Sequence, residues 1–254
     1  MTTLKKESKG DEVKTLQTLL GITADGIFGN DTEAAVKAFQ TAHGLTADGI
    51  VGNKTWAALQ PPQTDELAIT RLPITANLTR CHRTIRYIVV HYTAGASSAA
   101  GSARGVQKLF CKAKHQASAD FVVDDAEIVQ CNPDLPAYYC WAVGDGKGAY
   151  GVTNTNSVSI EMCSTLRKDT SSSKPNHEGW SLSLAVLKHT ADLVRYLMKK
   201  YNVPKERVIR HYDASRKACP GVVGWNESTL YNTDGTKTTK KNNSSKWKEW
   251  WNAL

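Results

Sequence analysis

The sequence lacks any apolar run approaching the ~18 residues that a membrane-spanning helix needs, so we expect no stable insertion into a membrane. It also lacks a secretory signal, because the stretch Met1–Val13 has lysines but no apolar core behind them. We therefore expect the chain to stay in the cytoplasm until another factor delivers it elsewhere. Its 254 residues, 41% hydrophobic and 22% charged, otherwise fit a soluble globular protein with one large or two smaller domains.

Support for a disulfide framework is also lacking. Six cysteines are present, namely Cys81, Cys111, Cys131, Cys140, Cys163 and Cys219. Without an export signal, their thiols are expected to stay reduced. We therefore expect most of them to be small buried residues, with Cys219 as the exception.

Acidic residues are too few to balance the basic ones, and the formal net charge is +8. Residues 1–60 hold six lysines against seven acidic residues, so the whole excess lies further along the chain. Part of it comes from Lys237, Lys240, Lys241, Lys246 and Lys248. A basic balance suits an anionic partner such as nucleic acid, a membrane surface or an acidic cell wall. Charge alone does not choose among these.

An internal repeat marks the N-terminal part. The segment TADGIFGN at residues 23–30 returns as TADGIVGN at residues 46–53, and its Asp-Gly and Gly-Asn pairs are typical of turns. Helices are predicted over residues 11–20, 31–40 and 54–59. Thr32 and Thr55 are expected to cap the second and third helices. We therefore predict a small all-α three-helix domain over residues 1–60.

This unit resembles the small peptidoglycan-binding domain attached to many wall hydrolases. The stretch ADGIFGNDTEAAVKAFQ shows the likeness, which extends over nearly the whole unit. The alternative is a generic helical bundle in which the repeat serves folding only. Residues 61–79, with Pro61, Pro62 and Pro73, are predicted to form an extended linker.

From residue 80 to residue 254 the pattern changes to strands alternating with helices. Strands are predicted over residues 86–92, 119–123, 127–131, 158–162 and 208–211. Helices are predicted over residues 102–115, 182–201 and 246–253. We expect an α/β domain with a central mixed sheet and flanking helices. The polar segments 165–179 and 226–245 are predicted to be surface loops.

The last predicted helix contains Trp247, Trp250 and Trp251. Their apolar area is most simply buried against the domain. Because lysines lie beside them, a helix on a membrane surface is the alternative.

Three chemically active side chains lie at or just after the ends of predicted strands. His91 ends one strand, His211 ends another, and Cys219 follows in a loop that must fold back toward His211. Two imidazoles and a thiolate make a sensible catalytic zinc site, since such sites commonly use three protein ligands and leave a fourth position for water. On the residues alone, a structural role for each histidine stays open.

Residues 82–221 resemble the zinc amidase family that includes phage lysozyme-type amidases and peptidoglycan-recognition proteins. The likeness rests on four stretches: IVVHYTAG, SADFVVDD, NTNSVSIEMC and IRHYDASRKACPG. It implies that His91, His211 and Cys219 are zinc ligands, with one Zn²⁺ per chain. The third ligand is Asp in some members of the family and Cys in others.

The same resemblance places catalytic roles on Glu161 and Lys217. Glu161 is expected to be the general base, kept ionised by the nearby metal and accepting a proton from metal-activated water. Some members use a tyrosine where this chain has Ala119, so Glu161 must contribute more here. Lys217 is expected to stabilise the oxyanion that develops on the amide carbonyl. A strand-closing surface glutamate and a solvated loop lysine are the alternatives, and Arg216 is a rival for Lys217.

The sequence departs from the family around the expected cleft. Residues 139–145, YCWAVGD, stand where many members have a His-Ala-Gly run and some have Trp-Ala-Val-Gly, and Asp120 replaces a common histidine. These departures put the details of substrate recognition in doubt. Candidate substrate contacts are Trp141, Asn154, Asn156 and Thr93.

The two resemblances together imply a peptidoglycan hydrolase that cuts the amide between N-acetylmuramic acid and L-alanine with zinc-activated water. Its expected partner is peptidoglycan and not nucleic acid. A wall-binding module without an export signal is similar to a phage or prophage endolysin, released from the cytoplasm through a membrane hole made by a holin. Two alternatives remain, a recognition protein that binds peptidoglycan without cutting it and a thiol peptidase with Cys219 as nucleophile and His211 as base.

Overall fold

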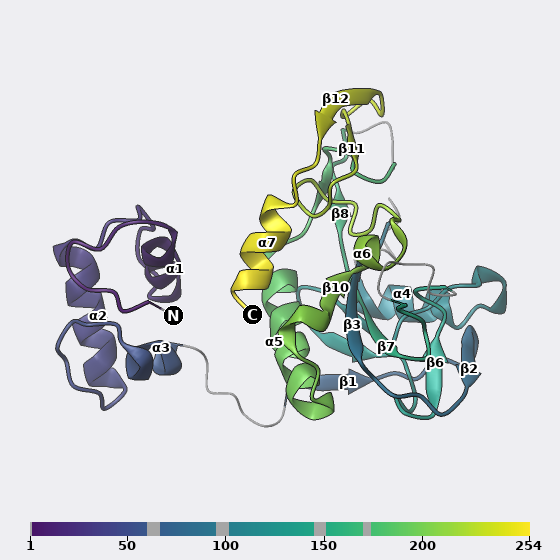
Figure 1. Ribbon diagram of the computed structural model, residues 1–254, viewed down its shortest axis with the longest axis horizontal. Helices are drawn as coiled ribbons and strands as arrows, with labels where there is room; N and C mark the ends of the chain where they lie inside the picture. The colour runs from purple at the N-terminus through teal and green to yellow at the C-terminus, as the bar shows by residue number, and fades with distance from the viewer. Residues whose placement is uncertain (1, 60–66, 95–101, 145–150, 170–173) are drawn as a thin grey trace. The chain divides into compact units, whose positions relative to one another are not determined.

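The computed structural model describes residues 2–59, 67–94, 102–144, 151–169 and 174–254 (Figure 1). The chain divides into two compact units, Met1–Glu66 and Leu67–Leu254. Within the described residues, no helix combines the length and apolar character that a membrane span requires.

The first unit packs three helices around one small core. These are α1 (Asp11–Leu19), α2 (Asn30–Ala42) and α3 (Asn53–Leu59). The buried core consists of Leu4, Val13, Leu16, Phe28, Val36, Val51, Trp56 and Leu59. The predicted three-helix fold is therefore confirmed, with each helix within two residues of its expected bounds.

The repeat forms a buried hydrogen-bond network, and its first copy centres on Gln17. The Nε2 of Gln17 donates to Asp25 Oδ1 at 2.7 Å, to the Ile27 carbonyl at 3.0 Å and to Thr32 Oγ1 at 2.9 Å. Its Oε1 accepts from the Gly26 N–H at 2.8 Å. Gly26 has φ 79°, the left-handed region that favours glycine. The glutamine thus ties the turn to helix α1.

The second copy repeats this network around Gln40. Its Nε2 donates to Asp48 Oδ1 at 2.8 Å, to the Ile50 carbonyl at 2.9 Å and to Thr55 Oγ1 at 3.1 Å. Its Oε1 accepts from the Gly49 N–H at 2.9 Å. The sequence repeat is therefore also a structural repeat.

The two threonines do not cap their helices as predicted. The N-cap of α2 is Gly29, and the Thr32 hydroxyl is used inside the glutamine network. Thr55 is buried within α3 and has the same role. The tertiary hydrogen bond to a distant glutamine replaces the local cap.

The second unit is built on a six-stranded sheet with the order β1-β5-β4-β7-β3-β10. Its strands are β1 (Ile69–Arg71), β3 (Tyr87–Tyr92), β4 (Phe121–Val123), β5 (Ile128–Gln130), β7 (Ser157–Met162) and β10 (Val208–Arg210). Only the β4–β5 pair is antiparallel among these neighbours. The predicted mixed sheet is confirmed, and each of the five predicted strands is present.

Helices cover both faces of this sheet. The helical elements are α4 (Ala103–Phe110), η1 (Ala113–His115), α5 (Leu184–Tyr201), η2 (Lys205–Arg207), α6 (His211–Ser215) and α7 (Ser245–Asn252). Helix α5 packs on the face that holds Phe121 and Val123, and α4 packs on the face that holds Val122. Because successive strand residues point to opposite faces, one strand serves both cores.

Three two-stranded pairs complete the second unit. They are β2 (Leu78–Arg80) with β6 (Tyr138–Cys140), β8 (Thr165–Leu166) with β9 (Trp180–Ser181), and β11 (Thr229–Tyr231) with β12 (Lys237–Lys241). Short strands therefore occur in both segments that were predicted to be polar loops. These strands have exposed or half-buried faces, so they lack the apolar alternation that would have indicated them.

The predicted linker and its boundary at residue 80 need correction. Residues 67–79 belong to the second unit, because β1 pairs with β5 at the edge of the sheet and Ile74 is buried. Of the predicted linker, residues 61–66 lie outside the described residues. Pro73 lies two residues after the end of β1, between Leu72 and Ile74, whose N–H groups donate to the Gln130 and Cys131 carbonyls. A residue without an N–H is therefore accommodated at this edge at little cost.

The tryptophans of α7 pack against the unit. The Trp250 indole donates to the Leu187 carbonyl at 3.1 Å, and the Trp251 indole donates to the Val208 carbonyl at 3.0 Å. The Trp247 ring lies 5.8 Å from that of the fully buried Trp225. This packing agrees with burial against the domain and leaves the membrane-surface alternative without support.

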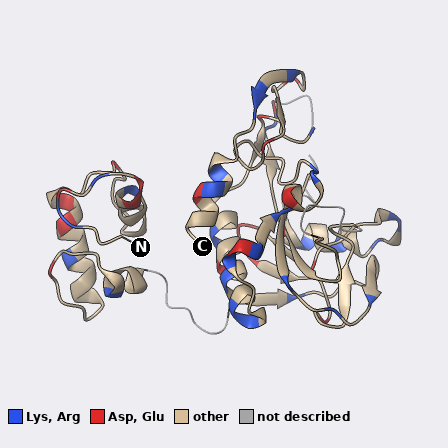
Figure 2. Ribbon diagram, viewed as in Figure 1, with Lys and Arg blue, Asp and Glu red and all other residues tan. Residues whose placement is uncertain are grey.

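The basic excess lies in the second unit, as predicted from the sequence. Figure 2 shows basic residues, in blue, along the ribbons of α5, α7 and β12. Lys237, Lys240 and Lys241 on β12 are all exposed.

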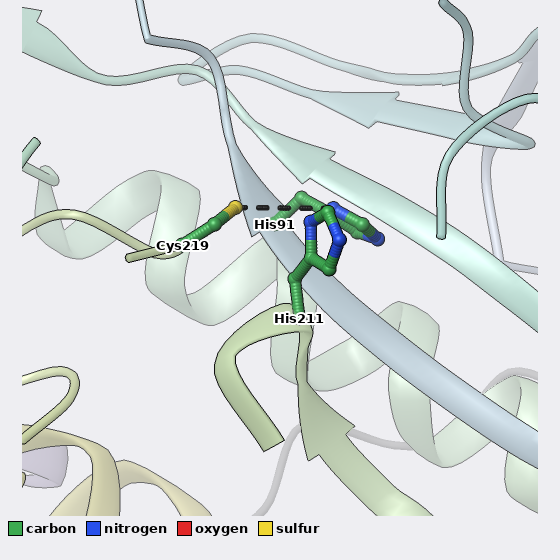
Figure 3. A group of neighbouring side chains, drawn as sticks. All are labelled: His91, His211 and Cys219. Carbon is green, nitrogen blue, oxygen red and sulfur yellow. Dashed lines mark hydrogen bonds between the residues drawn. The ribbon is translucent and has the colours of Figure 1, made fainter. Parts of the chain in front are cut away.

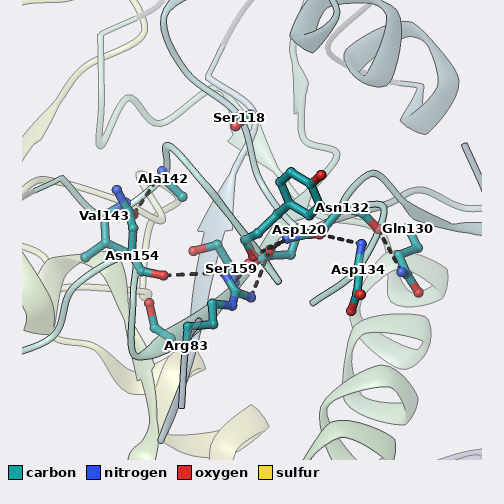
Figure 4. A network of polar contacts seen from close by, with 12 residues as sticks. Arg83, Ser118, Asp120, Gln130, Asn132, Asp134, Ala142, Val143, Asn154 and Ser159 are labelled. Atoms are coloured by element: carbon teal, nitrogen blue, oxygen red, sulfur yellow. Dashed lines mark hydrogen bonds and ion pairs between the residues drawn. The ribbon is translucent and has the colours of Figure 1, made fainter. Parts of the chain in front are cut away.

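A buried ion pair joins the segment before β3 to β4. Arg83 Nη2 lies 3.0 Å from Asp120 Oδ1, and both side chains are at most 2% exposed (Figure 4). Asp120 also accepts from Asn132 Nδ2 at 2.6 Å and from the Ser159 N–H at 2.8 Å. Asp120 was expected around the cleft, but its carboxylate is enclosed by these internal partners. It therefore ties β4 to β7 and has a structural role.

We predict that Asp120→Asn lowers the free energy of unfolding of the second unit by about 3 to 5 kcal/mol, because it leaves Arg83 buried without its counter-charge. The control is Glu127→Gln, in the more exposed pair with Arg104, which should cost at most about 1 kcal/mol. Urea unfolding measures both. Equal losses in the two variants would contradict the role given to the buried pair.

Candidate metal centre

The sheet register brings two histidines together. His91 is the fifth residue of β3, and His211 follows directly after β10. These strands are parallel neighbours in which Val90 pairs with Arg210, so the next residue of each strand reaches the same edge. The two imidazole centroids are 4.5 Å apart (Figure 3).

Cys219 joins them because the chain reverses after α6. Arg216, with φ 62°, ends that short helix in the left-handed region, and the Tyr212 N–H then donates to the Cys219 carbonyl at 2.8 Å. The Cys219 sulfur lies 3.8 Å from His91 Nδ1. One ligand atom from each of the two histidines and the cysteine lies within 4.8 Å of the others. The structure therefore brings the three predicted ligands together by the expected return loop.

The environment of these groups fits a metal ion. His91 Nε2, His211 Nδ1 and Glu161 Oε2 are buried without a hydrogen-bond partner among the described residues. Burial holds the pKa of His91 well below its usual value, and nearby His211 and Lys217 lower it further. Burial also lowers the pKa of His211 to about 4. Both rings are therefore neutral at neutral pH, which leaves a lone pair on each for a cation.

The burial of Cys219 disfavours its thiolate form unless a cation lies beside it. Burial raises the pKa of this thiol far above its ordinary value, and the charge of Glu161 raises it further. A thiolate in this place would be unfavourable unless a positive ion lay beside it. Two neutral imidazoles and one thiol are the donor set that zinc prefers. The residues present therefore fit zinc.

Glu161 lies directly beside the cluster. It pairs with His91 across β7 and β3, and its Oε1 is 4.0 Å from His91 Nδ1. The side chain is 19% exposed. Burial raises the pKa of Glu161 to about 8, and the charge of Lys217 acts in the opposite direction. A dication in the cluster would, like Lys217, favour the ionised form of Glu161 over the protonated form.

Lys217 is exposed on the loop between His211 and Cys219. Its charge lowers the pKa of both histidines, so the ammonium group acts on the cluster electrostatically. The rival Arg216 instead places its guanidinium over the Tyr212 ring at 5.4 Å. This geometry favours Lys217 as the cation that faces the site.

Three of the four candidate substrate contacts are buried or half-buried side chains with internal partners. Asn154 Oδ1 accepts from the Val143 N–H at 2.7 Å, and Asn156 Oδ1 accepts from the Thr153 N–H at 2.9 Å. Thr93 Oγ1 accepts from the Ser164 N–H at 3.1 Å. Each of these bonds holds a loop or turn in shape. Substrate contact by these side chains stays a prediction.

Trp141 differs from these three because its side chain is exposed. The residue is 39% exposed, and its indole donates to Thr79 Oγ1 at 2.9 Å. A partly exposed, hydrogen-bonded aromatic ring suits recognition of a sugar or peptide. Asp145, at the end of the variable 139–145 segment, lies outside the described residues.

Sequence reasoning missed two features of the site. The Tyr92 hydroxyl is buried and has no hydrogen-bond partner in the described ranges. Burial raises the pKa of this hydroxyl, and the charges of Cys219 and Glu161 raise it further. A Cβ on Gly221 would lie 2.2 Å from that hydroxyl oxygen, so only glycine fits there. The second feature is a group of three buried asparagines, Asn176, Asn226 and Asn242, that donate to the backbone carbonyls just after Cys219. Both come from contacts between distant segments, which no local pattern reveals.

Comparison with known proteins gives the family. Residues 82–222 match the N-acetylmuramoyl-L-alanine amidase family, and residues 9–59 match a peptidoglycan binding domain. The first match covers more than half of the chain. This chain therefore belongs to the N-acetylmuramoyl-L-alanine amidase family.

Two curated proteins with the same family description and one solved structure are similar to this chain. The N-acetylmuramoyl-L-alanine amidase CwlH of Bacillus subtilis (strain 168) is 32% identical over 162 residues, which cover 62% of this chain and 56% of that protein. The N-acetylmuramoyl-L-alanine amidase CwlL of Bacillus licheniformis is 28% identical over 175 residues, covering 63% and 45% of the two chains. The chain thus spans about half the length of these relatives. The solved catalytic domain of XlyA is 27% identical, with a TM-score of 0.47, and the match covers 61% of this chain and 90% of that one.

We predict that the purified protein binds about one zinc ion per chain, because the cluster supplies one set of three ligands. Cys219→Ala should lower the zinc content and the affinity, and chelation should have the same effect on the wild type. Cys163→Ala, which removes another buried thiol outside the cluster, is the matched control and should bind zinc normally. Elemental analysis and chelator competition measure both. Full zinc binding by Cys219→Ala would show that the ligand assignment is wrong.

Proposed function

We propose that this protein hydrolyses peptidoglycan at the amide between N-acetylmuramic acid and the L-alanine of its stem peptide, using one zinc ion. The observation that supports this best is the buried cluster of His91, His211 and Cys219 with Glu161 beside it, in a chain of the amidase family. The matched peptidoglycan binding domain supports the same substrate.

The cluster would hold the ion through two imidazoles and one thiolate. When bound, zinc supplies a Lewis acid that polarises the amide carbonyl and acidifies water. The protein contributes a dry setting, since all three ligands are at most 5% exposed. It also keeps both imidazoles neutral through burial, so neither must lose a proton before binding.

Glu161 has the position of a general base. Within the part of the chain that the structure describes, its Oε2 has no hydrogen-bond partner, and its Oε1 lies at the edge of the cluster. The carboxylate can therefore accept a proton from water attacking the amide. The same carboxyl group can then return that proton to the leaving amine. Lys217, exposed beside the cluster, can approach the developing oxyanion with its charge.

The two alternatives fit the site less well. A thiol peptidase needs a nucleophile whose pKa is lowered, whereas burial and Glu161 raise the pKa of Cys219. A recognition protein that does not cut would not need the cysteine ligand that this chain keeps. Chelation distinguishes all three, because only the zinc hydrolase would lose its activity with the metal.

Two expectations stay predictions. One is release from the cytoplasm through a membrane hole made by a holin, and the other is a phage or prophage origin. The pairing of a wall-binding unit with a hydrolase supports an endolysin role. Cells that make the protein in their cytoplasm should lyse only when a hole-forming protein is co-expressed. Lysis without that protein would contradict the proposed route.

We predict that Glu161→Gln lowers turnover by about 10²- to 10⁴-fold, because the amide keeps the size of the side chain but cannot accept the proton. Zinc content should stay at the wild-type level. The control is Glu206→Gln, an exposed residue of η2 at the opposite end of β10, which should leave turnover unchanged. Release of soluble products from purified peptidoglycan measures turnover. A Glu161→Gln enzyme as fast as the wild type would rule out the general-base role.

We predict that removing the first unit slows digestion of intact walls and leaves cleavage of small soluble muropeptides unchanged. Tethering raises the local enzyme concentration on an insoluble substrate without changing the active site. The shortened chain should begin at Leu67, because a later start would remove β1. Rates on both substrates at low enzyme concentration test this.

The isolated first unit should also sediment with purified peptidoglycan. Residues 1–60 of this unit hold six lysines and seven acidic residues, which nearly cancel, so binding should persist at salt that screens simple charge attraction. Two results together would contradict the wall-binding proposal: a first unit that stays in the supernatant, and a truncated enzyme that digests walls at the full rate.

A further inference from the structure

The loop that carries Cys219 is held from behind by other segments of the chain. Residues 219–222 are all buried. The Pro220 carbonyl accepts from Asn226 Nδ2 at 2.6 Å, and the Gly221 carbonyl accepts from the Asn176 N–H at 2.9 Å. The Val222 carbonyl accepts from Asn242 Nδ2 at 3.1 Å. Three consecutive carbonyls after the cysteine thus find their donors on three asparagines.

These three asparagines, which we name the asparagine clamp, also bind one another. Asn176 Oδ1 accepts from Asn226 Nδ2 at 2.8 Å and from Asn242 Nδ2 at 3.5 Å. Each residue is at most 3% exposed. The side chains have further partners, since Asn226 Oδ1 accepts from the Ser228 N–H and Asn242 Oδ1 accepts from the Gly224 N–H. A buried network with its groups paired in this way is rigid.

The opposite side of the loop is equally constrained. Gly221 lies against the Tyr92 ring so closely that a Cβ would be 2.2 Å from the hydroxyl oxygen. Tyr92 in turn follows His91 on β3. The loop is therefore fixed between the clamp and the strand that carries another member of the cluster.

Two of the clamp residues come from the C-terminal segment 223–254. The match to the amidase family ends at residue 222, so Asn226 and Asn242 lie beyond it. The segment is anchored on the residue before His211, because Arg210 Nη1 donates to the Trp225 carbonyl at 2.9 Å and to Ser244 Oγ at 2.6 Å. The same segment thus contacts the chain next to two of the three cluster residues.

We propose that the asparagine clamp positions Cys219 as a metal ligand, and that the C-terminal segment is thereby part of the metal centre. This inference rests on the zinc site proposed above. Removing Asn226 would leave the Pro220 carbonyl buried without its donor, and such a group is costly unless the loop moves to find a new partner. Movement of the residue next to Cys219 would displace the sulfur from the two imidazoles. The clamp residues are positioning residues, because they act through the cysteine.

The test compares Asn226→Ala with Asn232→Ala in the full chain. Asn232 belongs to the same C-terminal segment, but its side chain donates to Thr236 Oγ1, in the turn between β11 and β12. Zinc affinity is measured by chelator competition, and Co²⁺ loaded in place of zinc reports thiolate ligation through its sulfur-to-metal charge-transfer band. We expect Asn226→Ala to weaken zinc binding by about 10- to 100-fold, as outer-shell changes do, and to weaken the cobalt band. Asn232→Ala should change neither.

Two further variants separate positioning from a general loss of stability. Val106→Ala opens a cavity in the core under α4, which includes no residue of the 219–222 loop, so it should destabilise the unit but keep wild-type zinc affinity and the cobalt band. Asn242→Ala is the milder clamp variant, because the Val222 carbonyl still accepts from the Trp225 N–H at 3.0 Å. It tests the clamp should Asn226→Ala fail to fold.

The outcomes are distinct for the two proposals. Wild-type zinc affinity and an unchanged cobalt band in the folded clamp variants would overturn the clamp, and so would an equal loss of affinity in Val106→Ala. Cys219→Ala serves as the reference for the zinc site itself. If Cys219→Ala binds zinc like the wild type, or the wild type binds none, the proposed zinc site fails. If Cys219→Ala loses zinc and the clamp variants keep it, only the clamp fails.

Discussion

The parallel pairing of β3 with β7 and β10 is the constraint on which the site depends. Parallel strands end at a common edge, so one register aligns His91 with Glu161 and places His211 beside them. A shift of one residue would turn these side chains to the opposite face of the sheet. The position of the third donor depends on this edge too, because Cys219 reaches the cluster from a loop that begins where β10 ends.

Burial sets the protonation states of the groups at this edge of the sheet and also lowers the stability of the fold. Neutral imidazoles, an unpartnered carboxylate oxygen and a protonated thiol are all kept from water there. Burying such groups lowers the stability of the folded protein unless a ligand compensates for their lost hydration. A cation that binds the thiolate and the two imidazoles would therefore stabilise the fold when it binds. Two buried polar networks next to this edge fix the positions of the cluster residues. The Arg83–Asp120 pair ties β4 to β7 on one side, and the buried asparagines hold the Cys219 loop on the other.

The sequence predicted the parts of the structure that have local signals. The runs of β-branched residues before His91, Glu161 and His211 indicate buried strands, and the spacing of His211 and Cys219 requires a returning loop. Features that depend on distant partners were missed or misassigned. Nothing near Asp120 reveals that Arg83 lies 37 positions earlier with its charge buried. Likewise, Thr32 has the local pattern of a cap, yet a glutamine in another helix uses its hydroxyl. Polar segments such as 226–245 look exposed because the asparagines that they bury resemble ordinary loop residues.

The most direct test of the central claim is the identity of the bond that is cut. Purified peptidoglycan would be digested to completion, and the soluble and glycan fractions would be analysed by mass spectrometry with labelling of new chain ends. The account predicts intact stem peptides with a free amino-terminal L-alanine, glycan strands that have lost their peptides, and no product after zinc removal. New reducing sugar ends, cleavage inside the stem peptide, or the same products with chelator present would contradict it.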